Sequence, residues 1–231
     1  MIKDFKKISQ ALSISFQNLD LLKEALTHRS FLNEHKDWGI PHNERLEFLG
    51  DSILGFVVAD NLVKQYPQFA EGELTSLRAA LVNSDSLLAV AKELKFEDYL
   101  LVSHGEAKEL KNSRSYLLAN VVEALIGALY LDGGVEKAKD FIKKYILSKA
   151  EIILKTASYK DAKSLFQEKS QELLGITPTY KSLQSWGPDH AKQFEIGVYL
   201  NEDLISQGKG YSKQEAEINA AQEALKAKDW K

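Results

Sequence analysis

The first two thirds of the chain carry apolar residues at the three- and four-residue spacing of amphipathic helices. Such segments are LDLLKEALTH, ELTSLRAALVN, SDSLLAVAKEL, SYLLANVVEALIGALYL and GVEKAKDFIKKYILSKAEIIL. Helix ends are predicted at Tyr66-Pro67 and at Asp132-Gly133-Gly134. Because there is no internal repeat and no alternation of strands with helices, the pattern predicts an all-α domain over residues 1–155.

The pattern changes beyond residue 160. AKSLFQEKSQELL predicts a helix that Asp161 caps and Gly175 ends. TYKSLQSWG, KQFEIGVYL and DLISQGKG then predict three short strands, and SKQEAEINAAQEALKAK predicts a last helix. The prediction is an α-β-β-β-α domain over residues 161–229, joined to the first domain by a linker at 156–160.

One predicted helix begins with NERLEFLGDS and continues as ILGFVVADNLV. Glu44, Glu47 and Asp51 stand at i, i+3 and i+7, within roughly 60° of one another around the helix. From Asp51 onward the helix is apolar nearly all round, which is typical of a buried helix. Partly buried carboxylates are costly unless a metal ion, a basic partner or shared protons neutralise them.

A second helix, within residues 115–131, repeats this combination of polar and apolar residues. Asn120 and Glu123 stand at i and i+3 in an otherwise apolar segment, and Gly127 would allow another backbone to approach closely. If the two helices face each other, their oxygen atoms form a group of hard ligands that suits Mg²⁺. The alternative is a structural role, in which buried Arg or Lys residues satisfy the acids.

Composition limits the classes of function only broadly. The chain has 231 residues, 44% of them hydrophobic, and a net charge of −3, so a nucleic-acid surface would have to come from local clustering of basic residues. It has no cysteine, which excludes disulfides and thiolate zinc sites and fits a cytoplasmic protein with no disulfide partner. The charged N-terminus lacks the apolar core of a signal peptide, and no run approaches the ~18 apolar residues of a membrane helix. We therefore expect a cytoplasmic protein with no membrane partner.

His28, His35 and His42 recur every seven residues. No partner motif accompanies them, so their spacing does not favour a zinc site.

Several motifs resemble one known family. NERLEFLGD resembles the signature of the ribonuclease III family, and LLANVVEALIGALYLDGG resembles its second catalytic helix. LTHRS and EGELTSLRAALV also resemble that family, and the segment 161–227 resembles a double-stranded-RNA-binding domain. The resemblance implies an N-terminal all-α ribonuclease III domain followed by a small α+β double-stranded-RNA-binding domain, as in the bacterial type of the enzyme.

The resemblance also implies an activity. A member of this family is expected to be a Mg²⁺-dependent endoribonuclease, with Mn²⁺ as a substitute, acting as a homodimer in RNA processing, including that of ribosomal RNA. Its products from double-stranded RNA would carry 5′-phosphates, 3′-hydroxyls and two-nucleotide 3′ overhangs. The rival hypothesis is a non-catalytic double-stranded-RNA-binding dimer that lost cleavage through Asn120.

By the same resemblance, individual residues take roles. Asp51 and Glu123 match the catalytic core. The positions that match metal ligands are Glu47, Asp51, Asn120 and Glu123. Glu44 and Glu71 match accessory acidic positions near the subunit interface and the RNA path. The family has an aspartate where this chain has Asn120, whose amide oxygen can still bind Mg²⁺ but brings one negative charge fewer.

The second domain is expected to bind about 16 base pairs of duplex by shape. Positions that match RNA contacts are Ser164, Gln167 and Glu168 in its first helix, His190 in a loop, and Lys209, Ser212 and Lys213 at the start of its last helix. The helix start would bind phosphate through backbone N–H groups. Gln214 replaces a lysine that is frequent in the family, so this phosphate clamp is expected to be weaker.

Overall fold

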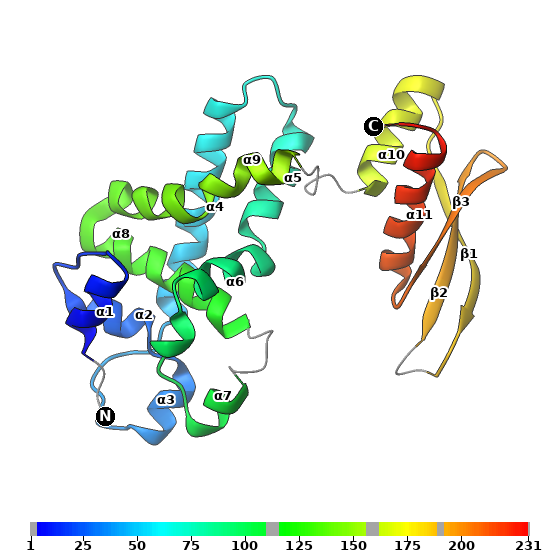
Figure 1. The fold of residues 1–231 in the computed structure, drawn as a ribbon. Helices are drawn as coiled ribbons and strands as arrows, with labels where there is room; N and C mark the ends of the chain where they lie inside the picture. Colours follow the sequence, from blue (N-terminus) through cyan, green and yellow to red (C-terminus); the bar gives the residue numbers. More distant parts are fainter. Residues whose placement is uncertain (1–3, 110–115, 156–161, 189–191, 231) are drawn as a thin grey trace. The chain divides into compact units, whose positions relative to one another are not determined.

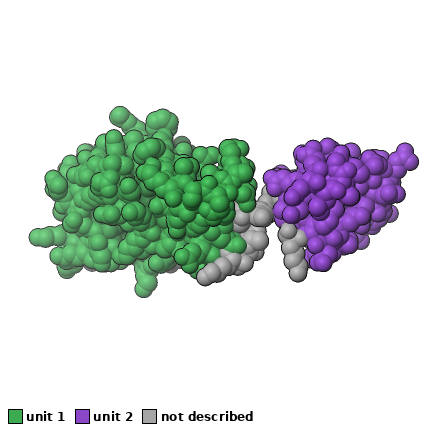
Figure 2. All heavy atoms as spheres, turned by 90° about the horizontal axis from the view of Figure 1, so that it is seen from above, with its two compact units in different colours: residues 1–159 green, residues 160–231 purple. Residues whose placement is uncertain are grey.

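The structure is a computed structural model that describes residues 4–109, 116–155, 162–188 and 192–230. The chain forms two compact units, residues 1–159 (unit 1) and residues 160–231 (unit 2), which Figure 2 shows in green and purple. The predicted linker, residues 156–160, and the predicted cap Asp161 lie outside the described residues.

Unit 1 is built from helices, as the periodicity predicts (Figure 1). The α-helices are α1 (Phe5–Ala11), α2 (Leu19–Ala25), α3 (Arg29–Glu34), α4 (Glu44–Gln65), α5 (Glu71–Val82), α6 (Ser84–Glu93), α7 (His104–Glu109), α8 (Tyr116–Tyr145) and α9 (Ala150–Lys155). Two short 3₁₀ helices, η1 (Phe96–Asp98) and η2 (Leu147–Lys149), complete the set. The segment GVEKAKDFIKKYILSKAEIIL is therefore not one continuous helix, because η2 separates α8 from α9.

The predicted helix ends have local causes. The helix α4 ends at Gln65, immediately before Tyr66-Pro67, since proline disfavours helical backbone at the residue before it. Helix α8 bends where Gly133 and Gly134 leave the helical conformation, and Gly134 has a φ of +76°.

Asp132 fixes this bend of α8 to the N-terminal helices. Its fully buried side chain accepts hydrogen bonds from the backbone N–H of Gln17 at 3.0 Å and of Asn18 at 2.8 Å. It also pairs with the ammonium of Lys137. The start of α2 is thus held to the middle of α8 across more than a hundred residues of sequence.

The core of unit 1 surrounds α4 and α8, which cross at its centre (Figure 1). The crossing is close because glycines meet backbone there: a Cβ on Gly50 would lie 1.8 Å from the carbonyl oxygen of Glu123, and one on Gly127 would lie 2.2 Å from that of Leu46. By length and composition Tyr116–Leu154 could cross a membrane, but 56% of its apolar window is buried inside the protein. The place of this segment in the core accounts for its apolar composition.

The expectation that α4 is buried on all sides from Asp51 onward was wrong for Phe56 and Val63. Its buried residues are Leu46, Gly50, Leu54, Val57, Val58 and Leu62. Phe48, Phe56 and Val63 are 78%, 62% and 58% exposed. Apolar side chains occur both in the core of a protein and on surfaces that bind a partner. The sequence alone therefore did not distinguish the face of α4 that packs on α8 from this exposed stripe.

Unit 2 has the predicted α-β-β-β-α order. It comprises α10 (Ala162–Leu174), β1 (Thr179–Trp186), β2 (Gln193–Leu200), β3 (Asp203–Gly210) and α11 (Lys213–Ala227). The strands form an antiparallel sheet in the order β1-β2-β3. In β2, Ile196, Val198 and Leu200 are buried, and Val198 and Leu200 share a core with Phe166 of α10 and with the alanines of α11.

The glycine crossing predicts a large difference between two substitutions in α4. Gly50→Ala should destabilise unit 1 by about 2 kcal/mol or more, because α4 and α8 must separate to admit the methyl group. Gly55→Ala is the matched control, since a Cβ there meets nothing within 4 Å, and its higher helix propensity should leave stability unchanged or raised by up to about 1 kcal/mol. Urea unfolding followed by helical circular dichroism measures both, and equal stability of the two variants would refute the close crossing.

Candidate active site

The crossing of α4 and α8 brings together the acidic residues that the sequence singles out. Gly50 lies between Glu47 and Asp51 on α4, and the backbone it meets on α8 is that of Glu123. The side chain of Asn120, one turn earlier on α8, hydrogen-bonds to Glu47. The two helices therefore present Glu47, Asp51, Asn120 and Glu123 at one place.

Glu123 has the most perturbed carboxyl group of this set. Burial raises its pKa, and the nearby negative charges of Asp51 and Glu47 raise it further, to about 7. Asp51 itself is exposed. Because the surroundings oppose a negative charge on Glu123, the site favours any species that brings positive charge to it.

Glu47 is subject to opposing effects. Burial raises the pKa of its carboxyl, the hydrogen bond from Asn120 lowers it, and the charges of Glu44 and Asp51 raise it again, with a net upward shift. A hydrogen bond that lowers a carboxyl pKa is donated to the charged form, so the Asn120 amide acts here as a donor. A carboxylate at position 120 could not replace that donor.

The donor set fits a divalent cation in its chemistry. Three carboxylates and an amide oxygen are hard ligands of the kind that Mg²⁺ prefers. In the described part of the chain, however, no three His, Cys, Asp or Glu residues come within reach of one metal ion.

The two accessory acids differ in position. Glu44 lies at the edge of the group, where its charge affects Glu47, and it pairs with Arg29 at 3.5 Å and with His42 at 3.8 Å. Glu71 is exposed at the first residue of α5 and accepts a hydrogen bond from Thr75 at 3.0 Å. Glu71 is not among the groups whose charges raise the pKa of Glu47 or of Glu123.

Asn43 holds the first turn of α4 in place, a role that the sequence did not reveal. It is 3% exposed, donates its backbone N–H to the carbonyl of Thr27 at 2.9 Å, and donates its side-chain amide to the carbonyl of Ala25 at 3.3 Å. The turn carrying Glu44 and Glu47 is thereby fixed to the end of α2. The sequence signal for this role is an asparagine directly before the helix that starts with ERLEFLGD, because a buried amide needs hydrogen-bond partners.

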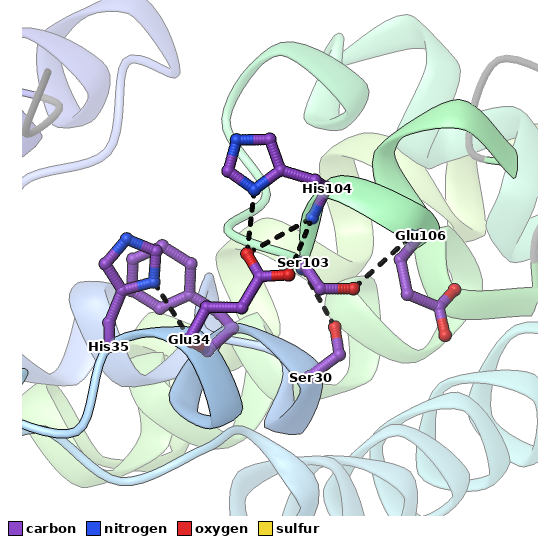
Figure 3. A network of polar contacts seen from close by, with 7 residues as sticks. Ser30, Glu34, His35, Ser103, His104 and Glu106 are labelled. Atoms are coloured by element: carbon purple, nitrogen blue, oxygen red, sulfur yellow. Dashed lines mark hydrogen bonds and ion pairs between the residues drawn. The ribbon is translucent and has the colours of Figure 1, made fainter.

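A polar network between α3 and α7 supports the LTHRS segment (Figure 3). The Glu34 carboxylate accepts the backbone N–H of His104 at 3.3 Å and lies 2.9 Å from its Nδ1, which lowers the pKa of Glu34. The Ser30 hydroxyl oxygen accepts the backbone N–H of Ser103 at 3.0 Å. These partners lie 70 residues or more apart in sequence, so no local pattern could have predicted the contacts.

The three regularly spaced histidines have separate partners. His28 Nδ1 lies 2.8 Å from the Ser30 hydroxyl, and His35 Nδ1 lies 3.1 Å from the carbonyl oxygen of Phe31. His42 faces Glu44. The described part of the chain thus holds no cluster that would make these histidines a zinc site.

In unit 2, the residues singled out for RNA binding are mostly exposed. Those of α10 are Ser164, Gln167 and Glu168, all on its surface. Ser212 caps α11 by accepting the backbone N–H of Glu215 at 3.1 Å, and Lys213 is exposed beside it. Lys209 lies 3.5 Å from the carboxylate of Glu195 and 5.5 Å from the ring centroid of Trp186. His190 lies outside the described residues.

Comparisons with known proteins agree with this arrangement. A family model described as Ribonuclease-III-like matches residues 18–150, and one described as Double-stranded RNA binding motif matches residues 162–228. The chain is 43% identical to Ribonuclease 3 of Borreliella burgdorferi over 221 residues, covering 96% of this chain and 90% of that protein. It is 44% identical to Ribonuclease 3 of Bacillus licheniformis over 223 residues, covering 96% and 89%.

Solved structures give the same result for unit 1. The nuclease domain of ribonuclease III from Campylobacter jejuni superposes with a TM-score of 0.55 at 38% identity, covering 64% of this chain and 97% of that one. A second structure of that domain is described as showing structural flexibility in a region involved in dimer formation. The chain therefore belongs to the ribonuclease III family, and it is an endoribonuclease that carries a double-stranded RNA binding motif.

Proposed function

We propose that the protein is a cytoplasmic, Mg²⁺-dependent homodimeric endoribonuclease that cleaves double-stranded RNA during RNA processing, ribosomal RNA included. Its products would carry 5′-phosphates, 3′-hydroxyls and two-nucleotide 3′ overhangs. The observation that carries the proposal is the Glu123 carboxyl, whose pKa of about 7 reflects burial and the charges of Asp51 and Glu47. A site with this electrostatic imbalance stabilises a divalent cation and, through it, a phosphate.

The residues that would hold the cation are Glu47, Asp51, Asn120 and Glu123. A bound Mg²⁺ would supply activation of water near neutral pH and neutralisation of charge on the leaving oxygen. The chain itself fixes the geometry, since the glycine crossing sets the distance between the two helices and Asn43 fixes the first turn of α4. The Asn120 amide, which lowers the pKa of the Glu47 carboxyl, would lie beside that carboxylate in the cation site.

The exposed stripe of α4 supports the dimer. Phe48, Phe56 and Val63 recur at intervals of eight and seven residues, which places them along one side of the helix. Exposed apolar side chains in a row indicate a protein–protein interface. Phe48 directly follows Glu47, so a second copy packed on this stripe would place its own acidic group nearby.

The rival hypothesis, a non-catalytic RNA-binding dimer, would need an active site that cannot function. The chain has Glu47, Asp51 and Glu123 in place, and the amide oxygen of Asn120 remains a hard ligand. The charges at this site therefore favour the enzyme over the rival.

The direct test is digestion of a long RNA duplex by the full chain with and without Mg²⁺. We expect the parent protein to cut only with Mg²⁺, and Glu123→Gln to lose more than about 100-fold in rate, because it removes a charge from the cation site. Glu136→Gln is the matched control on the same helix, since that side chain is 77% exposed and pairs only at the surface with Lys139. A parent protein that binds the duplex but never cuts it would favour the rival.

Melting curves in EDTA show whether the Glu123→Gln variant still folds. Measured over a range of pH, they also test whether the pKa of Glu123 is raised in the parent. The pKa of Glu123 rises from 4.5 to about 7 on folding, so between these pH values the folded protein holds a proton that the unfolded chain has lost. The contribution of Glu123 to the free energy of unfolding is therefore fully present below about pH 4.5 and is lost as the pH rises towards 7. Glutamine does not titrate, so the variant's melting temperature should gain on the parent's over that interval. A constant difference between the two at all pH values would contradict the raised pKa.

Asn120→Asp should make the site depend more strongly on its cation. The substitution adds a negative charge and removes the donor to Glu47. It therefore increases the repulsion among the carboxylates when no metal is bound, and it increases their attraction for Mg²⁺ when the metal is present. We expect half-maximal cleavage at a lower Mg²⁺ concentration, a lower melting temperature in EDTA and a larger rise on adding Mg²⁺. Asn201→Asp, an exposed site in unit 2, makes the same charge change as a control. An unchanged Mg²⁺ requirement would place residue 120 outside the cation's shell.

The dimer is tested by sedimentation at micromolar concentration. Phe48→Glu should convert a dimer to a monomer without unfolding it, because this side chain is 78% exposed in the single chain. Leu173→Glu, at a 54% exposed position on α10, adds the same charge away from the stripe and should leave the dimer intact. If the parent protein is itself monomeric and active, the paired-cut arrangement is wrong.

A further inference from the structure

An ion pair joins the two helices of unit 2. The ammonium of Lys163 on α10 lies 2.6 Å from the carboxylate of Glu217 on α11, and the two side chains are 33% and 26% exposed. The same ammonium lies 4.9 Å from the ring centroid of Tyr180. Lys163 therefore lies in the seam between the helices.

This seam borders the surface proposed to bind RNA. On α10, Lys163 precedes Gln167 by one helical turn, and on α11, Glu217 follows Lys213 by one turn. Helices α10 and α11 pack side by side (Figure 1), and the ion pair joins them one turn from Gln167 on α10 and one turn from Lys213 on α11. A carboxylate in this position is unfavourable for a phosphate-binding surface.

The first turn of α11 carries a second acid. Glu215 accepts the backbone N–H of Tyr211 at 2.7 Å, and the Ser212 hydroxyl accepts the backbone N–H of Glu215 at 3.1 Å. These contacts place the Glu215 carboxylate at the helix end that would otherwise attract an anion. Lys209, two residues before Tyr211, forms an ion pair with Glu195. Lys213 is exposed and forms no ion pair with any other residue that the structure describes.

We infer that Glu217 sets the strength of duplex binding by unit 2, because it holds Lys163 away from the RNA phosphates. The inference rests on the proposed binding of duplex RNA by this unit. Phosphate contacts contribute much of the affinity of any protein for a duplex, and each lysine that makes one adds to the salt dependence. With Lys163 held by Glu217, unit 2 makes one phosphate contact fewer than its lysines allow.

Removing the acid should leave the fold intact. The core of unit 2 is formed by Phe166, Val198, Leu200 and the buried alanines of α11, and it does not include this ion pair. Glu217→Gln keeps the size of the side chain. Melting curves of the variant and the parent verify that unit 2 is folded in both.

The experiment measures binding of the full-length protein to a labelled RNA duplex of about 16 base pairs, in EDTA, over about 0.05–0.2 M salt. Glu217→Gln should bind about three- to tenfold more tightly at the lowest salt, and its log–log salt slope should steepen by about one. Glu223→Gln is the matched control: it removes the same charge from the same helix, where Glu223 pairs at 2.7 Å with Lys226. Equal affinities of the two variants would overturn the inference.

A double substitution tests whether Lys163 is the residue released. Lys163→Met combined with Glu217→Gln replaces a neutral pair by two uncharged side chains and keeps an apolar stem over Tyr180. Its affinity and salt slope should return to those of the parent. If the double variant keeps the gain of Glu217→Gln, then Glu217 does not act through Lys163.

A third substitution separates this inference from the proposed function. Lys213→Ala should weaken binding of the parent, because Lys213 belongs to the proposed phosphate contact whatever Glu217 does. If the parent does not bind the duplex and Lys213→Ala changes nothing, the proposed RNA binding by unit 2 fails. If Lys213→Ala weakens binding but Glu217→Gln matches Glu223→Gln, only the role of Glu217 fails.

Discussion

The contact between the backbones of α4 and α8 at Gly50 and Gly127 is the constraint on which the candidate active site depends. At these two positions the helices are so close that even the Cβ of an alanine would overlap the backbone of the other helix. The acids on both helices are thereby forced into one region, although like charges repel. The surrounding core, in which Leu54, Val58, Val122 and Leu125 are fully buried, offsets that repulsion by removing apolar surface from water.

The cost of this arrangement appears at Glu123, which retains its proton to about pH 7 because burial and neighbouring charges disfavour its ionised form. Functional sites commonly carry such unfavourable electrostatics, which a ligand relieves. Asn120 moderates the effect, since it replaces a possible fourth charge with an amide that donates to Glu47. In the proposed cation site, the same amide would bring one negative charge fewer than a carboxylate.

Much of the fold could be predicted because its signals are local. Periodicity, Pro67 and Gly175 each act within a few residues, and the strand pattern of β2 is visible in its own sequence. The meeting of the two acidic helices was predictable from Gly127, because a glycine in an apolar helix indicates close approach.

The features that could not be predicted depend on distant parts of the chain or on other molecules. Phe56 was expected in the core but lies on the surface. The sequence pattern of an apolar helix face is the same whether that face packs against the core or against another molecule. The contact of Glu34 with His104 joins segments 70 residues apart, so no local pattern indicates it.

The attachment of Asp132 to Gln17 and Asn18 has a consequence for how the chain acquires its structure during synthesis. Helices α2 and α4 find their main packing partner in α8, and the backbone N–H groups of Gln17 and Asn18, just before α2, find their acceptor in Asp132 of α8. The ribosome adds residues from the N-terminus at about 5–20 per second, so α1 to α4 leave the exit tunnel seconds before α8 exists. During that interval their apolar faces are exposed to water and to chaperones, and unit 1 can close only when α8 has emerged.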